Sequence, residues 1–97
     1  MVKVKIAGYM IDKEDEIESD DTYIIVEVEY KEKIYNIIEE VRDVLPCTVK
    51  GWIDGNKKIK KNLIIVLNDK IVNKQKMDSY NVSEDDTLEF LTQFAGG

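Results

Sequence analysis

Residues 34–46 of the 97-residue chain read IYNIIEEVRDVLP, and this stretch decides the class of fold. Its apolar side chains recur three and four residues apart, which places them on one face of a helix about three turns long. They are Ile34, Ile37, Ile38, Val41, Val44 and Leu45. Because proline lacks the N–H that a helix interior needs, we expect Pro46 to end this helix.

Two segments before the helix alternate between apolar and polar side chains, as half-buried strands do. They are residues 2–8 and residues 24–30, and we expect them to pair as a hairpin with a long loop. That loop, residues 10–21, is rich in Asp and Glu and is expected to be solvated.

Three further segments after the helix indicate strands. Residues 63–67 are five apolar residues in a row, which favours a strand covered on both faces, or by a helix on one and a loop on the other. Asn68 and Asp69 are typical of a tight turn, so residues 70–72 can fold back as an edge strand. Residues 87–92 alternate again. This order predicts an α+β fold, in which one main helix covers one face of a sheet of about five strands.

The composition excludes several classes of function. A net charge of −6 disfavours nonspecific binding to nucleic acid or to an anionic membrane, and suits a basic surface on a protein partner. The chain has no histidine and no glycine-rich phosphate-binding motif. Without a Ser-His or Cys-His pair or a histidine ligand, we expect neither an enzyme nor a metal site.

The single cysteine, Cys47, rules out an internal disulfide and fits a reducing compartment. No apolar run approaches the length of a membrane helix, and the first residues lack the apolar core of a signal peptide. We therefore expect a cytoplasmic protein.

Each of four loop features can be interpreted either as structural or incidental, or as functional. Cys47 is expected to be an incidental, partly buried residue, the alternative being a sulfur-relay or thioester site. The acidic residues between positions 12 and 21 are expected to be solvated rather than to bind a cation, since they lack the EF-hand spacing. The lysines of the irregular loop 47–62 are expected to be solvated, with docking or conjugation as alternatives. Trp52 is expected to pack on the core, with an exposed partner contact as the alternative.

Three short motifs in the C-terminal third resemble the ubiquitin-like sulfur carriers of the MoaD/ThiS family. They are Ile64-Ile65-Val66-Leu67-Asn68-Asp69, Val82-Ser83-Glu84-Asp85-Asp86-Thr87-Leu88 and the terminal Ala95-Gly96-Gly97. The resemblance implies a β-grasp fold with a mixed sheet, formed by residues 1–92, and a flexible tail at residues 93–97. Two features depart from the family: Thr92-Gln93 stands where proline is frequent, and the loops 10–21 and 47–62 are long.

The resemblance also implies a mechanism. An E1-like, ubiquitin-activating-type enzyme would bind the body of the carrier and thread the tail into its own ATP site. The Gly97 carboxylate would become an acyl-adenylate and then a thiocarboxylate, whose sulfur passes to a biosynthetic enzyme. Gly96 and Ala95, as part of the threaded tail, would bind this partner, and Phe94 is expected to contact it as well. The carrier itself would bind no cofactor, since the activating enzyme uses the ATP, and it would be a monomer when free.

Several destinations remain open. The resemblance to MoaD-like chains favours molybdopterin- or tungstopterin-type synthesis, with thiamine thiazole synthesis, tRNA thiolation and cysteine synthesis as alternatives. A protein modifier, joined to lysines through Gly97, would use the same end of the chain. A non-catalytic β-grasp interaction domain with an inert tail is a third hypothesis.

Overall fold

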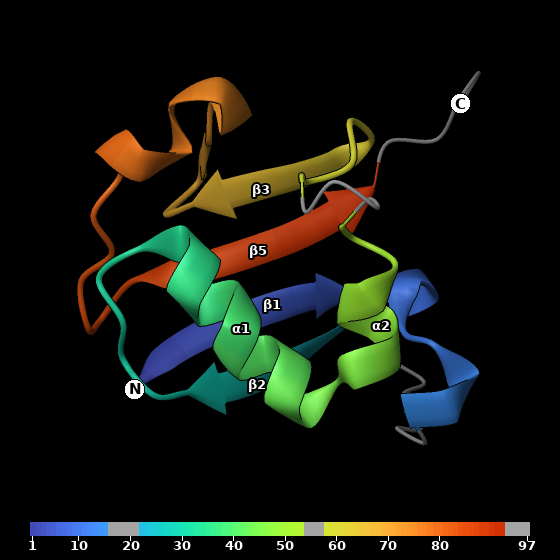
Figure 1. Ribbon diagram of the computed structural model, residues 1–97. Helices are drawn as coiled ribbons and strands as arrows, with labels where there is room; N and C mark the ends of the chain where they lie inside the picture. The colour runs from blue at the N-terminus through green and yellow to red at the C-terminus, as the bar shows by residue number, and fades with distance from the viewer. Residues whose placement is uncertain (16–21, 54–57, 93–97) are drawn as a thin grey trace.

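The computed structural model of the chain describes residues 1–15, 22–53 and 58–92 (Figure 1). Within these ranges the strands and α-helices are β1 Val2–Ala7, β2 Tyr23–Val28, α1 Ile34–Val44, α2 Pro46–Lys50, β3 Leu63–Leu67, β4 Lys70–Ile71 and β5 Thr87–Thr92. Three 3-10 segments connect them, at Gly8–Met10, Lys13–Asp15 and Lys74–Ser79.

The five strands form one mixed sheet in the order β2-β1-β5-β3-β4. β1 pairs antiparallel with β2, as predicted for the first hairpin. β5 inserts between β1 and β3, parallel to the first and antiparallel to the second. The last strand of the chain is therefore the central strand of the sheet, and the predicted α+β fold with a mixed sheet is confirmed.

The turn at Asn68 and Asp69 shows why this pair suits a two-residue hairpin. Their φ angles are 48° and 71°, in the left-handed region that asparagine and aspartate tolerate better than most residues. The Asn68 side chain also donates to the Asp86 carboxylate at 2.8 Å and accepts from the Thr87 N–H at 3.0 Å. The predicted turn is therefore confirmed, and it is tied to the first residue of β5.

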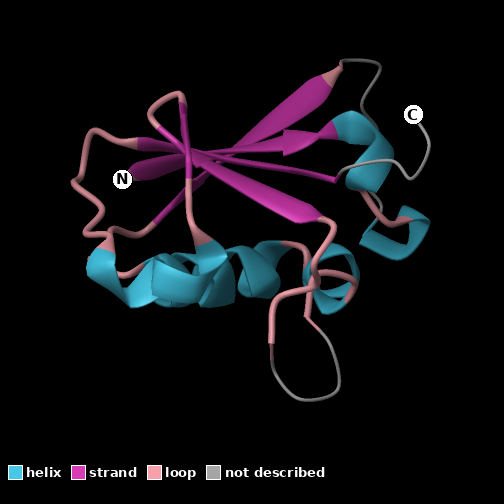
Figure 2. Ribbon diagram, turned by 90° about the horizontal axis from the view of Figure 1, so that it is seen from above, coloured by secondary structure: helices cyan, strands magenta, loops and turns pink. Residues whose placement is uncertain are grey.

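Helix α1 packs on one face of the sheet, and α2 continues along the same face (Figures 1 and 2). Five residues of the predicted apolar stripe are buried: Ile34, Ile37, Ile38, Val41 and Leu45. Val44 is 49% exposed, so its assignment to the core was wrong. A rotation of about 100° per residue places Val44 at the edge of the stripe, where it turns away from the sheet.

Trp52 packs on the core, as predicted, and does not form an exposed contact. Its side chain is 3% exposed. Its ring stacks on that of Phe90 in the central strand, with ring centroids 4.6 Å apart and planes 18° from parallel. This stack attaches the chain after α2 to the middle of the sheet.

The expectation of an irregular segment from residue 47 was wrong for residues 47–50, which belong to α2. Pro46 ends α1 and then occupies the start of α2, where its missing N–H costs nothing. The next two N–H groups, of Cys47 and Thr48, donate to the Asp15 carboxylate at 3.0 and 2.7 Å. The Thr48 hydroxyl donates to the same carboxylate and accepts from the Asp12 N–H at 2.9 Å.

Asp15 therefore caps α2 from a distant loop, and the expectation of a solvated acidic loop was wrong at this residue. Partial burial by itself raises the pKa of the Asp15 carboxyl, but the hydrogen bonds from Thr48 and Cys47 outweigh it. The net result is a pKa below the ordinary value, because the bonds favour the ionised form.

Replacing Trp52 with alanine should remove the stack on Phe90 and leave a cavity beside the central strand. We expect a loss of about 3–5 kcal/mol in the free energy of unfolding. Chemical denaturation followed by far-UV circular dichroism measures it. Tyr35→Ala, at an exposed position of α1, is the control and should change stability by about 0.5 kcal/mol or less. Equal losses in the two variants would contradict the packing role.

Replacing Asp15 with asparagine should weaken the attachment of α2. The contribution of the carboxylate is complete above about pH 5 and disappears as the pH falls through the lowered pKa of the folded state. Near neutral pH we therefore expect Asp15→Asn to lose about 1 kcal/mol of stability, since the site is partly solvent-exposed. As the pH falls through the lowered pKa of the folded state, the wild type and the variant should converge. Denaturation across this range tests it, with the exposed Asp85→Asn as control. A difference that does not depend on pH would refute the capping role.

Candidate functional site

The whole segment 93–97 lies outside the described residues. It includes the four tail residues that the sequence analysis named, Gly97, Gly96, Ala95 and Phe94. The structure does describe the point from which this segment continues. That point is Thr92, the last residue of β5. We call Thr92 and the side chains around it the tail root.

Tyr9 holds the backbone of Thr92 with two hydrogen bonds. Its hydroxyl donates to the Thr92 carbonyl at 2.9 Å and accepts from the Thr92 N–H at 3.1 Å. Tyr9 belongs to the 3-10 segment directly after β1, and on its other side Thr92 is in register with Leu63 of β3. The tail root is thus held from both neighbouring segments. The sequence carried no signal for this contact, which joins residues 83 positions apart.

A groove with a volume of about 330 Å³ lies beside the tail root. Its described lining residues come from the turn after β1, from α2 and from the end of β5. They are Tyr9, Met10, Asp12, Cys47, Thr48, Gly51, Trp52 and Thr92. The fold therefore brings Cys47 and the end of the last strand to the same groove.

The surroundings of Cys47 do not favour a nucleophile. Its partial burial, a hydrogen bond from its Sγ to Glu14 at 3.6 Å, and the negative charges of Asp15, Glu14 and Asp12 all raise the pKa of the thiol. A thiol with a raised pKa stays protonated near neutral pH and reacts slowly. This favours the interpretation of Cys47 as an incidental residue over a sulfur-relay site.

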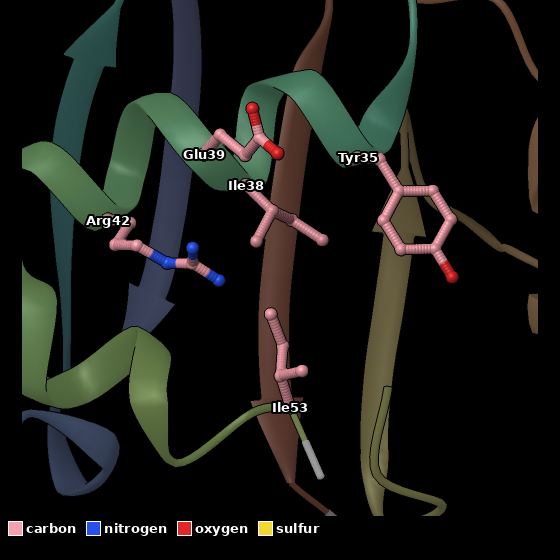
Figure 3. Close-up of a pocket in the computed structure, with 5 residues that line it drawn as sticks. All are labelled: Tyr35, Ile38, Glu39, Arg42 and Ile53. Atoms are coloured by element: carbon pink, nitrogen blue, oxygen red, sulfur yellow. The ribbon is translucent and has the colours of Figure 1, made fainter. Parts of the chain in front are cut away.

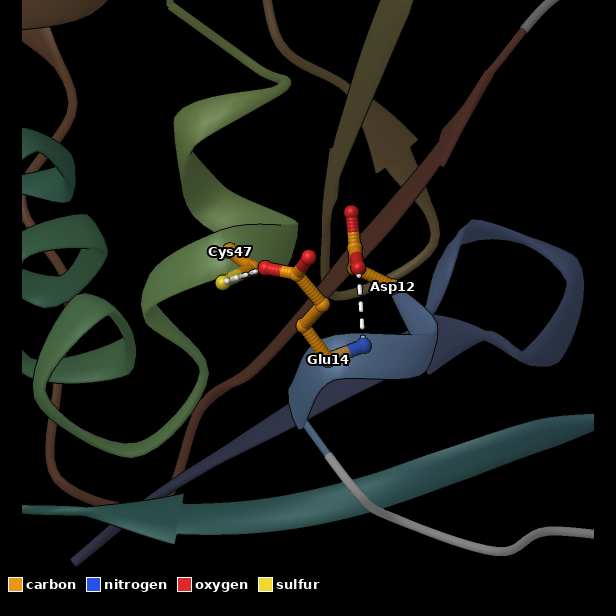
Figure 4. Close-up of side chains that lie close together, drawn as sticks. All are labelled: Asp12, Glu14 and Cys47. Atoms are coloured by element: carbon orange, nitrogen blue, oxygen red, sulfur yellow. Dashed lines mark hydrogen bonds between the residues drawn. The ribbon is translucent and has the colours of Figure 1, made fainter.

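Asp12, Glu14 and Cys47 form a cluster in which one possible ligand atom from each lies within 4.8 Å of the others (Figure 4). The Asp12 carboxylate accepts from the Glu14 N–H at 2.9 Å, and the Glu14 carboxylate accepts from the thiol. A metal ion would need the thiolate, which the neighbouring carboxylates disfavour. We assign no ion to this cluster.

A second groove, of about 260 Å³, lies between α1 and Ile53 (Figure 3). Tyr35, Ile38, Glu39 and Arg42 line it from α1. It shares no described lining residue with the groove at the tail root. Its charged side chains, Glu39 and Arg42, are both exposed on the helix, and we assign it no function.

The lysines of the loop 47–62 contribute little to the described site. Lys58, Lys60 and Lys61 are exposed, and Lys57 lies outside the described residues. Lys74 instead donates to the carbonyls of Lys60, Lys61 and Leu63 at 3.1, 2.8 and 2.6 Å. Its role is therefore to fix the entry into β3.

The face of the sheet opposite α1 carries exposed apolar side chains. One row of side chains crosses all five strands on this face, as the strand registers show: Ile25, Lys5, Glu89, Val66 and Ile71. The two ends of the row are apolar and exposed, Ile25 by 56% and Ile71 by 73%. The Lys5 ammonium lies 4.0 Å from the centre of the Tyr23 ring on the same face. We call this surface the open sheet face.

Solved structures share this fold. SAMP1 from Haloferax volcanii superposes with a TM-score of 0.71 at 10% identity, over 99% of this chain and 98% of that one. The Amycolatopsis orientalis BexX/CysO complex gives 0.67 at 21% identity, over 97% and 99%. CysO from Mycobacterium tuberculosis, an antigen, gives 0.68 at 13% identity, over 94% and 99%. At these identities the likeness shows the fold, which is the β-grasp that the resemblance implied. No curated protein sequence matches the chain.

None of the helices in the described ranges has the length and apolar character needed to cross a membrane.

The model of the ThiS family matches residues 5–97, from the middle of β1 through Gly97. This match spans nearly the whole sequence, and the mixed sheet and its packed helix agree with it. The chain therefore belongs to the ThiS family, whose ubiquitin-like β-grasp fold it adopts.

Proposed function

We propose that the chain is a ubiquitin-like sulfur carrier, a substrate of partner enzymes rather than a catalyst. An E1-like enzyme joins AMP from ATP to the Gly97 carboxylate and releases pyrophosphate. The outer sulfur of a donor persulfide then displaces the AMP, and a second thiol takes the inner sulfur into a disulfide, which leaves a thiocarboxylate on Gly97 for transfer. The observation that carries this proposal is the place of β5. The central strand of the sheet ends at Thr92, and the family match continues through residues 93–97.

The physical logic of the proposal lies in the contrast between body and tail. A strand paired on both sides gives the enzyme a fixed point from which the reactive carboxylate can be presented. Gly96 and Gly97 have no side chains to obstruct a narrow channel, and glycine accepts backbone angles that other residues avoid. We propose that Ala95 and Phe94 contact the activating enzyme. ATP is bound by that enzyme, and the chain holds no cofactor.

The proposed partners are the E1-like enzyme and a sulfur-accepting biosynthetic enzyme. The open sheet face, with its exposed Ile25 and Ile71, supports docking of a protein. The net charge of −6 favours a basic partner surface and disfavours nucleic acid and anionic membranes. A chain of this fold occurs in the BexX/CysO complex, which supports work with a partner. We propose that the chain itself is a monomer in the cytoplasm.

We further propose molybdopterin- or tungstopterin-type cofactor synthesis as the destination of the sulfur. Residues 64–69 and 82–88 support it, since they resemble MoaD-like chains. The acceptor enzyme decides between this route and thiamine thiazole synthesis, tRNA thiolation or cysteine synthesis, because that chemistry belongs to the acceptor.

A protein modifier is the second candidate function. The same Gly96-Gly97 end favours it, because an adenylated carboxylate can be attacked by a lysine amine as well as by sulfur. A non-catalytic interaction domain is the third, and the open sheet face supports it. In that case residues 93–97 would be inert.

The carrier function predicts a mass change on the chain isolated from its native host. Intact-mass spectrometry should show replacement of one carboxylate oxygen by sulfur, and deleting Gly96-Gly97 should abolish both this change and the biological activity. The deletion should leave the circular dichroism spectrum unchanged, because the described fold ends at Thr92.

Two results would decide against the carrier function. Lysines of other proteins that carry a Gly-Gly remnant, with no sulfur-bearing form of the chain, would identify a modifier. Full activity of the deletion variant in the native host would identify an interaction domain with an inert tail.

A further inference from the structure

The end of β5 is supported at Thr92, although its pairing with β1 has already ended there. β1 pairs with β5 only as far as Ile6 opposite Phe90. If β1 continued in the same parallel register, Gly8 would lie opposite Thr92 and would be its pairing partner. The chain instead turns into the 3-10 segment Gly8–Met10, and the Gly8 N–H bonds to the Thr22 carbonyl at 2.8 Å.

The Tyr9 side chain takes the place of the missing strand. A phenol hydroxyl has one hydrogen to donate and oxygen lone pairs to accept, and here it bonds both backbone groups of Thr92. Its bond lengths of 2.9 and 3.1 Å are those of ordinary hydrogen bonds. The side chain thus extends the two-sided pairing of β5 by two residues, from Phe90 to Thr92.

On the side of β5 that faces β1, this contact decides how many residues lie beyond the supported part of the strand. With Thr92 held, residues 93–97 reach at most about 17 Å from the sheet when fully extended. If β5 frayed back to Phe90, the free segment would grow by two residues, to a reach of about 24 Å. A longer and less directed segment has more conformations, and entering a narrow channel then costs more entropy.

We propose that Tyr9 is a positioning residue for activation of the C-terminus: its hydroxyl fixes Thr92 and so aims residues 93–97 at the adenylation site of the partner. This inference rests on the proposed carrier function. The ring of Tyr9 also lines the groove beside the tail root, so the test must remove the hydroxyl and keep the ring.

The first measurement needs no partner. Amide hydrogen exchange by NMR compares the wild type with Tyr9→Phe, which should speed exchange of the Thr92 N–H by about tenfold or more. Tyr80→Phe is the matched control, because the Tyr80 hydroxyl also accepts a backbone N–H, that of Asn73, at 3.0 Å. The two residues of this bond flank the 3-10 segment Lys74–Ser79, which lies at the end of the sheet away from the C-terminal end of β5 (Figure 1). Thr92 exchange in Tyr80→Phe should match the wild type.

The second measurement is ATP–pyrophosphate exchange by the native host's E1-like enzyme, with each chain as substrate. Tyr9→Phe should lower kcat/KM by about threefold to tenfold, mainly through a higher KM for the carrier, because the ordering cost is met on binding. Tyr80→Phe should keep the wild-type values although it also loses a hydrogen bond.

Unchanged Thr92 exchange in Tyr9→Phe would overturn the proposal, and so would unchanged adenylation despite faster exchange. Equal losses in the two variants would show a general effect on stability and would also overturn it. If the wild-type chain is not adenylated at all, the carrier function fails. In that case the exchange measurement still decides whether Tyr9 anchors Thr92.

Discussion

The rest of the structure depends on the pairing of β5 with β1 on one side and β3 on the other. This strand comes last in the chain, yet it joins the N-terminal hairpin to the β3–β4 hairpin. Without it the two hairpins would share no backbone hydrogen bonds among residues 1–15, 22–53 and 58–92, and α1 would have no continuous surface to cover. Its inward side chains, Leu88 and Phe90, are fully buried, and Trp52 stacks on the second of them.

The same constraint connects the fold to the proposed function. A C-terminal segment that leaves an edge strand would start from a point that frays easily, because an edge strand is paired on one side only. Here the segment leaves the central strand, and Tyr9 extends the two-sided support to Thr92. The support by neighbouring segments thus reaches Thr92, which suits the proposed presentation of the Gly97 carboxylate to an enzyme.

The acidic loop 10–21, which looked long in the sequence, has a structural role at Asp15. Asp15 reaches from the first loop to the N-terminus of α2, and its carboxylate binds two N–H groups and the Thr48 hydroxyl. Partial burial, together with the acidic residues around Cys47, raises the pKa of its thiol. These contacts give the acidic side chain at position 15 a structural role, the capping of α2 across a long distance in the sequence.

The sequence by itself determined the elements whose signals are local. The spacing of Ile34, Ile37 and Ile38 predicted α1, alternation predicted β1, β2 and β5, and an unbroken apolar run predicted β3. Asn68-Asp69 predicted the hairpin turn and the short β4 after it, because each of these signals depends on neighbours along the chain. Gly96-Gly97 and the motifs before it pointed to the family. Only the tertiary structure decided the central place of β5, the formation of α2 and the hold of Tyr9 on Thr92. Each of these depends on partners far away in sequence, such as Asp15 for α2, and no local pattern of side chains encodes which distant backbone group will be near.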